Sequence, residues 1–184
     1  VVKVMGLQGK LIANKNKQIE PLDYRGIKVV SMGGIQERED LAIMWRGPII
    51  AKAIEQLIHD TNWGELDALI VDFPPGTGDS PLTFFNLLKP DGVIIVTTPQ
   101  ETSLTDAAKS IDMCNSLEVP ILGLIENMCG EIFGKAQGKS LKFSIKYLGS
   151  IKLNKIYAGK RFWKKGVGTE LSSVYHLVQK LLFS

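Results

Sequence analysis

Cysteine, long apolar runs and strong net charge are all scarce in this sequence. Its 184 residues include only two cysteines, Cys114 and Cys129, too few for a disulfide framework. No uninterrupted run of about 18 apolar residues occurs, so no membrane-spanning helix is expected. The net charge of +3 is too weak to indicate nucleic-acid binding. We therefore expect a protein of the reducing cytoplasm that binds neither membranes nor nucleic acid.

Internal repeats, low-complexity segments and a signal peptide are also missing. The apolar stretch Val1–Leu7 is short and no small-residue cleavage site follows it. The first residue is not methionine, which leads us to expect that the chain begins inside a longer protein. The length, with 45% hydrophobic and 22% charged residues, suits a single globular domain over residues 1–184.

Positive charge is concentrated in one stretch near the C-terminus. The segment Lys135–Lys165 holds many lysines and no Asp or Glu. It is either a solvated face or a docking surface for an acidic partner or a phosphate-bearing ligand.

Apolar runs alternate with segments of helical spacing along the chain. The runs expected to form strands of a parallel sheet are Leu66–Asp72, Gly92–Thr98, Ile121–Glu126 and Tyr147–Ile151, with a further short strand at Gly26–Met32. The segments expected to form helices are Trp45–His59, Ser80–Leu88, Ser103–Leu117 and Glu170–Phe183. This alternation predicts a doubly wound α/β fold, in which ligands bind beyond the carboxyl ends of the strands.

The segment Ala68–Asp79 carries the strongest chemical signal. Asp72 ends an apolar run, where a carboxylate can hold a water of a Mg²⁺ shell, as the Walker B acid of P-loop enzymes does. Gly76 and Gly78 follow two prolines and let the backbone approach a phosphate. The amide of Gly76 is a candidate γ-phosphate sensor. The alternative is an ordinary strand-to-helix turn.

Two further strand ends carry polar residues. Thr98 and Pro99 begin a polar segment after the run Val93–Val96, and these residues either cap the following helix or contact a nucleotide. Asn127 follows the third run, and its amide offers both a donor and an acceptor, as the edge of adenine does. Taken alone, Asn127 is more typical of a loop residue at a strand end than of an adenine contact.

Taken in order, the motifs resemble one family. They are Trp45–Pro48, Trp63–Asp67, Val71–Asp79, Val96–Gln100 and Glu126–Met128. The chain resembles the Mrp/ApbC family of P-loop ATPases, relatives of MinD and ParA, closely over Val1–Gly134 and loosely beyond.

This resemblance implies a homodimer that binds ATP and Mg²⁺ and assembles or carries iron–sulfur clusters for client proteins. It also implies roles for particular residues. Asp72 would be the Walker B acid, Pro74–Gly78 a switch, and Asn127 an adenine contact.

The sequence departs from the family pattern in two places. The phosphate-loop pattern Gly-x-x-x-x-Gly-Lys-Ser/Thr is absent, so we expect the first strand and the phosphate loop to be missing from this chain. Where relatives carry Cys-x-x-Cys, two copies of which hold a [4Fe–4S] cluster, only Cys129 is present. Two Cys129 thiols with other ligands, a bridging disulfide, or a small buried side chain are the alternatives. Cys114 is expected in the core.

Three functions follow from this pattern. The first is an ATP-dependent protein of iron–sulfur cluster assembly or carriage. The second is a non-catalytic interaction module of the same fold, favoured by the absent phosphate loop and the single Cys129. The third is a positioning ATPase of the ParA/MinD kind, which the Trp45–Pro48 and Trp63–Asp67 motifs disfavour.

Overall fold

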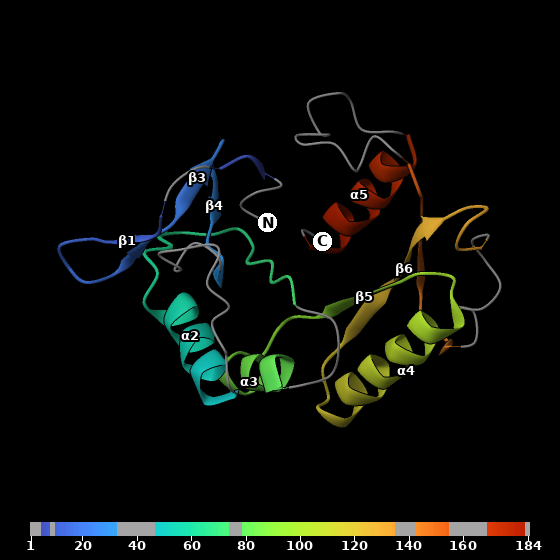
Figure 1. Ribbon diagram of the computed structural model, residues 1–184, viewed down its shortest axis with the longest axis horizontal. Helices are drawn as coiled ribbons and strands as arrows, with labels where there is room; N and C mark the ends of the chain where they lie inside the picture. Colours follow the sequence, from blue (N-terminus) through green and yellow to red (C-terminus); the bar gives the residue numbers. More distant parts are fainter. Residues whose placement is uncertain are drawn as a thin grey trace. The chain divides into compact units, whose positions relative to one another are not determined.

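The computed structural model describes residues 5–7, 10–32, 47–73, 79–134, 143–154 and 169–182 (Figure 1). The chain divides into two compact units, Val1–Leu88 and Lys89–Ser184. Among the described residues, no helix is both long and apolar enough to cross a membrane.

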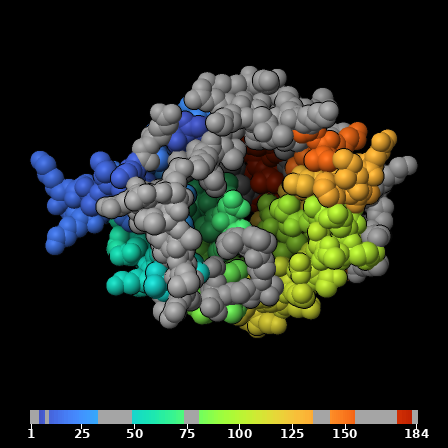
Figure 2. Space-filling model, in the orientation of Figure 1, coloured from blue at the N-terminus to red at the C-terminus, as the bar shows by residue number. Residues whose placement is uncertain are grey.

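The described residues of the first unit form two antiparallel strand pairs and two helices. The strands are β1 (Ile12–Ala13), β2 (Ile19–Glu20), β3 (Leu22–Tyr24) and β4 (Ile27–Val29), with β1 paired to β2 and β3 to β4. The helices are α2 (Gly47–His59) and α3 (Asp79–Leu87). The β1–β2 pair, in blue, projects from the surface of this unit (Figure 2).

Hydrogen bonds tie the β1–β2 pair to the end of α2. The side-chain amides of Asn14 and Asn62 donate to Glu20 Oε1 at 2.6 and 3.0 Å, and the Ile19 amide donates to the Asp60 carbonyl oxygen at 2.7 Å.

Pro48 lies in the first turn of α2, where a missing N–H costs nothing. The structure thus confirms the predicted helix within two residues of its expected start.

The segment Leu66–Asp72, predicted to be a strand, forms no strand in the structure. Its apolar side chains are exposed, and Ile70 is 77% accessible. A strand is stable only when its backbone groups pair with a neighbour, and within the described residues nothing pairs with this segment. The prediction was therefore wrong. The segment has the apolar composition of a strand, but no strand in the described residues pairs with its backbone.

The second unit is built on a three-stranded parallel sheet of order β5–β6–β7. Its strands are β5 (Val93–Thr97), β6 (Ile121–Cys129) and β7 (Tyr147–Lys152), and its helices are α4 (Glu101–Ser116) and α5 (Thr169–Leu182). These elements confirm the predicted strands and helices, with ends shifted by up to three residues.

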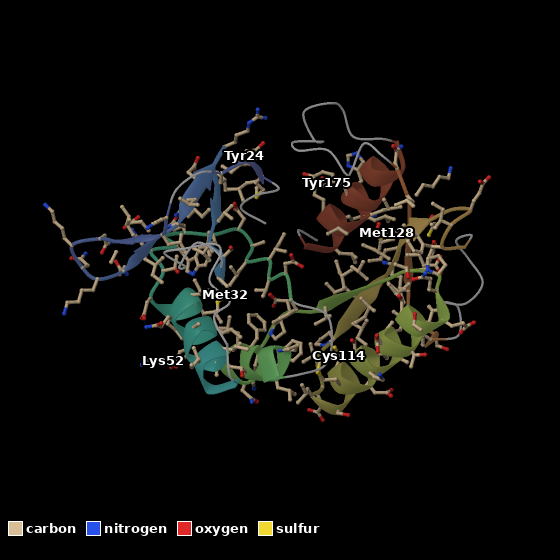
Figure 3. All side chains as sticks on the ribbon, viewed as in Figure 1. Tyr24, Met32, Lys52, Cys114, Met128 and Tyr175 are labelled. Atoms are coloured by element: carbon tan, nitrogen blue, oxygen red, sulfur yellow. The ribbon has the colours of Figure 1, made fainter. Side chains whose placement is uncertain are left out.

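A helix covers each face of this sheet, as a doubly wound fold requires (Figure 1). On one face Ala107 and Ile111 of α4 pack with Ile95 and Leu124. On the other, Val178 and Leu181 of α5 pack with Ile125 and Leu148. Cys114 of α4, labelled in Figure 3, is fully buried, which confirms its predicted place in the core.

Candidate functional site

The candidate site lies at the carboxyl ends of β5 and β6. These strands run parallel, and Thr97, the last residue of β5, pairs with Glu126. Thr98–Pro99 follows β5, and Asn127 is the next residue of β6 after this pair, so the two lie side by side. Two of the sequence motifs are thus brought to one edge of the sheet.

The connection from β5 to α4 is ordered by its own side chains. The Thr98 hydroxyl donates to Ser103 Oγ at 2.8 Å, which links the end of β5 to the first turn of α4. Pro99 is buried, and a Cβ placed on Gly134 would lie 3.3 Å from its Cβ. The turn after β6 therefore packs against Pro99. Thr98 bonds to a side-chain hydroxyl and caps no backbone amide, and the N-cap residue of α4, Gln100, makes no side-chain capping bond. The contact of Thr98 with a nucleotide stays a prediction.

The end of β6 departs from regular pairing at Asn127. Glu126 pairs with Ser150 and Cys129 with Lys152, so β6 holds one residue more than β7 between these pairs. Met128, labelled in Figure 3, has φ of 56°, a left-handed conformation unusual for a non-glycine residue. The Asn127 side-chain oxygen accepts the Met128 amide at 2.8 Å. Such extra residues re-aim side chains and are common beside functional sites.

Cys129 points its thiol into the protein. It is 3% exposed, and its thiol donates to the Glu126 carbonyl oxygen at 3.4 Å. The turn that follows is closed by two reciprocal amide–carbonyl bonds between Gly130 and Gly134, each 2.8 Å. The small buried side chain, one of the alternatives left open by the sequence, is the one the structure shows.

The remaining predicted site residues lie elsewhere or outside the described residues. Asp72 belongs to the first unit and is exposed. Gly76 and Gly78 are outside the described residues. The structure therefore groups Thr98, Pro99 and Asn127 at one edge and assigns Asp72 to the other unit.

Sequence reasoning missed a buried polar pair beneath this edge. Glu126 is 1% exposed, and the Tyr147 hydroxyl donates to its Oε2 at 3.3 Å. Burial raises the pKa of Tyr147, and the negative charge of Glu126 raises it further, while a hydrogen bond with Ser150 lowers it. The signal available in the sequence was a carboxylate that directly continues the apolar run Ile121–Ile125.

Metal-binding side chains are not clustered in the part of the chain that the structure describes. No group of three or more His, Cys, Asp or Glu residues there could hold an ion. A cluster of the [4Fe–4S] type takes four thiolates, whereas this edge offers one retracted thiol. Cys129 as it stands here does not fit the role of a cluster ligand.

The parallel sheet with a helix on each face is the α/β fold of the P-loop NTPase class. The family model described as "ParA: NUBPL iron-transfer P-loop NTPase" matches residues 1–160, and the chain belongs to this family. The match confirms the resemblance drawn from the sequence motifs.

Curated relatives agree with this assignment. The chain is 39% identical over 157 residues to an iron-sulfur cluster carrier protein of Deinococcus radiodurans, covering 80% of this chain and 45% of the relative. It is 46% identical over 140 residues to one of Pyrococcus horikoshii (70% and 47%). It is 41% identical over 157 residues to the iron-sulfur cluster transfer protein NUBPL of Dictyostelium discoideum (79% and 48%). The chain thus spans about half the length of these relatives.

Solved structures confirm the fold class. A nucleotide-binding protein of Archaeoglobus fulgidus in complex with ADP is 32% identical with a TM-score of 0.66, covering 85% of this chain and 65% of that one. The cell division ATPase MinD of Pyrococcus furiosus matches with a TM-score of 0.54 at 16% identity, covering 74% of this chain and 59% of its own, and shows the fold alone.

Proposed function

We propose that this chain is part of an ATP-binding and ATP-hydrolysing protein that assembles or carries iron–sulfur clusters. The observation that carries the proposal is the β5–β6 edge, where Thr98 and Pro99 follow Thr97, and Asn127 follows its pairing partner Glu126. The match to the iron-transfer P-loop family and to an ADP-bound structure supports a nucleotide at that edge.

Each predicted residue has a distinct task in this proposal. Asn127 would read the edge of adenine through its amide, and Thr98 and Pro99 would form the adjoining wall. Asp72 would hold a water of the Mg²⁺ shell, and Gly76 and Gly78 would bring the backbone close to the phosphates. In the complete protein these tasks combine binding with slow hydrolysis that drives a switch.

The cargo and the assembly state complete the proposal. We propose a homodimer that delivers clusters to apo-proteins, in the cytoplasm. Cys114 and Cys129 are reduced in the structure, in keeping with a reducing compartment. Because Cys129 is buried, cluster ligation would require movement of the β6 end or ligands from elsewhere in the dimer.

Nucleotide binding by the full-length natural protein tests this function. Calorimetric titration with ADP and ATP in the presence of Mg²⁺ should show binding, and phosphate release should show slow hydrolysis. Asn127→Ala should weaken ADP binding about tenfold, the loss of one good hydrogen bond to a base. Asp72→Asn should abolish most hydrolysis and weaken the dependence of binding on Mg²⁺.

Matched variants on the exposed face of α4 serve as controls. Asn115→Ala and Asp112→Asn make the same chemical changes away from the edge and should leave binding and hydrolysis unchanged. A full-length protein that binds no adenine nucleotide would contradict the ATPase proposal. Failure to pass a cluster to an apo-acceptor would contradict only the carrier role.

The second candidate is a non-catalytic interaction module. The irregular, exposed segment Leu66–Asp72 favours it, because a Walker B acid acts from the end of a regular strand. On this alternative the full-length protein forms dimers and binds clients without nucleotide. A positioning role of the ParA/MinD kind has only the shared fold to support it.

A further inference from the structure

A buried carboxylate–phenol pair connects the central strand of the sheet to its neighbour. Glu126 of β6 is 1% exposed, and the Tyr147 hydroxyl of β7 donates to it at 3.3 Å. A buried carboxylate costs several kcal/mol unless hydrogen bonds compensate for lost hydration. An apolar side chain at this place would fill the core without that cost, so the pair calls for a reason beyond packing.

The position of Glu126 in the sheet supplies that reason. It is the last residue of β6 that pairs with both neighbours, Thr97 on β5 and Ser150 on β7. Regular pairing to β7 is lost immediately afterwards and resumes only at Cys129. Asn127 therefore lies in the irregular part of β6 directly after Glu126, and we expect its direction to depend on how firmly Glu126 is held.

Hydrogen bonds join the side chain of Glu126 to β7 and its backbone carbonyl to Cys129, three residues further along the chain. Its carboxylate accepts the Tyr147 hydroxyl, while its carbonyl oxygen accepts the Cys129 thiol at 3.4 Å. The two bonds restrain the start and the end of the irregular stretch that contains Asn127 and Met128. The Asn127 side chain is restrained in turn by its own bond to the Met128 amide.

We propose that Glu126 and Tyr147 are positioning residues that orient Asn127 for the recognition of adenine. This inference rests on the proposed nucleotide-binding function and adds a determinant of base specificity to it. Adenine presents a donor beside an acceptor, and guanine presents the reverse pattern at the same edge. An amide held in one orientation can distinguish the two bases, whereas an amide free to turn accepts both.

The ratio of ADP affinity to GDP affinity is the readout that separates positioning from stability. In the full-length protein, Tyr147→Phe removes only the hydroxyl, and with it the bonds to Glu126 and Ser150. The ratio should fall about tenfold, since one oriented hydrogen bond to the base is lost. Loss of stability or of phosphate binding would lower both affinities together and leave the ratio unchanged.

Two substitutions at position 126 give an independent test. Glu126→Gln keeps an oxygen that accepts the Tyr147 hydroxyl and should retain the ratio within about twofold. Glu126→Ala keeps no acceptor, so its ratio of ADP affinity to GDP affinity should fall as it does in Tyr147→Phe. The control is Tyr175→Phe, which removes a hydroxyl from an exposed tyrosine on α5 and should change neither affinity.

The outcomes distinguish this inference from the function on which it rests. A wild-type protein that binds ADP, with equal ratios in Glu126→Gln, Glu126→Ala and Tyr147→Phe, would overturn the positioning role and leave the proposed function standing. A wild-type protein that binds neither nucleotide would overturn the proposed function, and the positioning role with it. A ratio lost in Glu126→Ala and kept in Glu126→Gln supports the inference even where Tyr147→Phe fails to fold.

Discussion

The Cys129 thiol donates to the carbonyl oxygen of Glu126 at 3.4 Å and is turned away from solvent. A thiol in this state reacts only when the end of β6 opens. We expect Cys129 to react with iodoacetamide at least about tenfold more slowly in the native protein than after unfolding in guanidinium chloride. Peptide mapping of the labelled protein measures this for Cys129 and Cys114 separately. Fast labelling of Cys129 alone in the native protein would instead show that its thiol is accessible to a metal.

A glycine on β6 is required by the close approach of β7. A Cβ on Gly123 would lie 2.7 Å from the Lys146 carbonyl oxygen and 2.5 Å from Leu148 Cγ. Because a backbone atom cannot move aside, Gly123→Ala should lower the free energy of unfolding by about 2 kcal/mol or more. Denaturant titration followed by circular dichroism measures this loss.

Gly130→Ala is the matched control for that substitution. Gly130 has φ of 150°, close to the 159° of Gly123, but a Cβ there would meet no atom within 4 Å. It should therefore cost only the backbone term, about 1 kcal/mol. Equal losses at the two positions would show that contact with β7 is not what requires glycine at 123.

The face of the sheet covered by α5 depends on Leu148. This side chain is 1% exposed and packs with Ile125 and residues of α5. Leu148→Ala should lower the free energy of unfolding by about 2–5 kcal/mol, because it leaves a cavity that the sheet cannot close. Ile132→Ala, at a residue 77% exposed, should change it by less than about 0.5 kcal/mol. Comparable losses for the two variants would place Leu148 outside the core.

Cys114 makes stability fall in alkaline solution. Burial raises the pKa of its thiol above the ordinary value of 9.0. As pH rises past that value, the unfolded chain releases this proton while the folded chain keeps it, so the free energy of unfolding decreases with pH. The decrease from this group approaches about 1.4 kcal/mol per pH unit until the folded thiol also ionises.

Substitution of the thiol tests this pH dependence. Cys114→Ala should be less stable at neutral pH because of the small cavity, but its stability should decline less steeply between about pH 9 and 10. Thermal unfolding across that range gives both slopes. Parallel slopes for the variant and the wild type would assign the alkaline loss to another group.

Local pattern predicted most elements of the second unit. The runs that became β5, β6 and β7 are continuous and apolar, and the segment Ser103–Leu117 predicted α4. Apolar runs and helical spacing are short-range features, so the sequence carries them directly. The sequence also predicted polar residues after the runs that form β5 and β6. The pairing of Thr97 with Glu126 confirms that these positions are neighbours.

The family, the fold class and the helices were determined by the sequence alone, because ordered motifs and apolar periodicity are written in neighbouring residues. The tertiary structure alone decided three other features. Leu66–Asp72 is not a strand, because pairing requires a partner that composition cannot supply. Cys129 is turned inward, and Glu126 is joined to Tyr147 across two strands. Strand pairing, burial and the Glu126–Tyr147 bond depend on segments far apart in the chain, which the order of amino acids does not reveal one segment at a time.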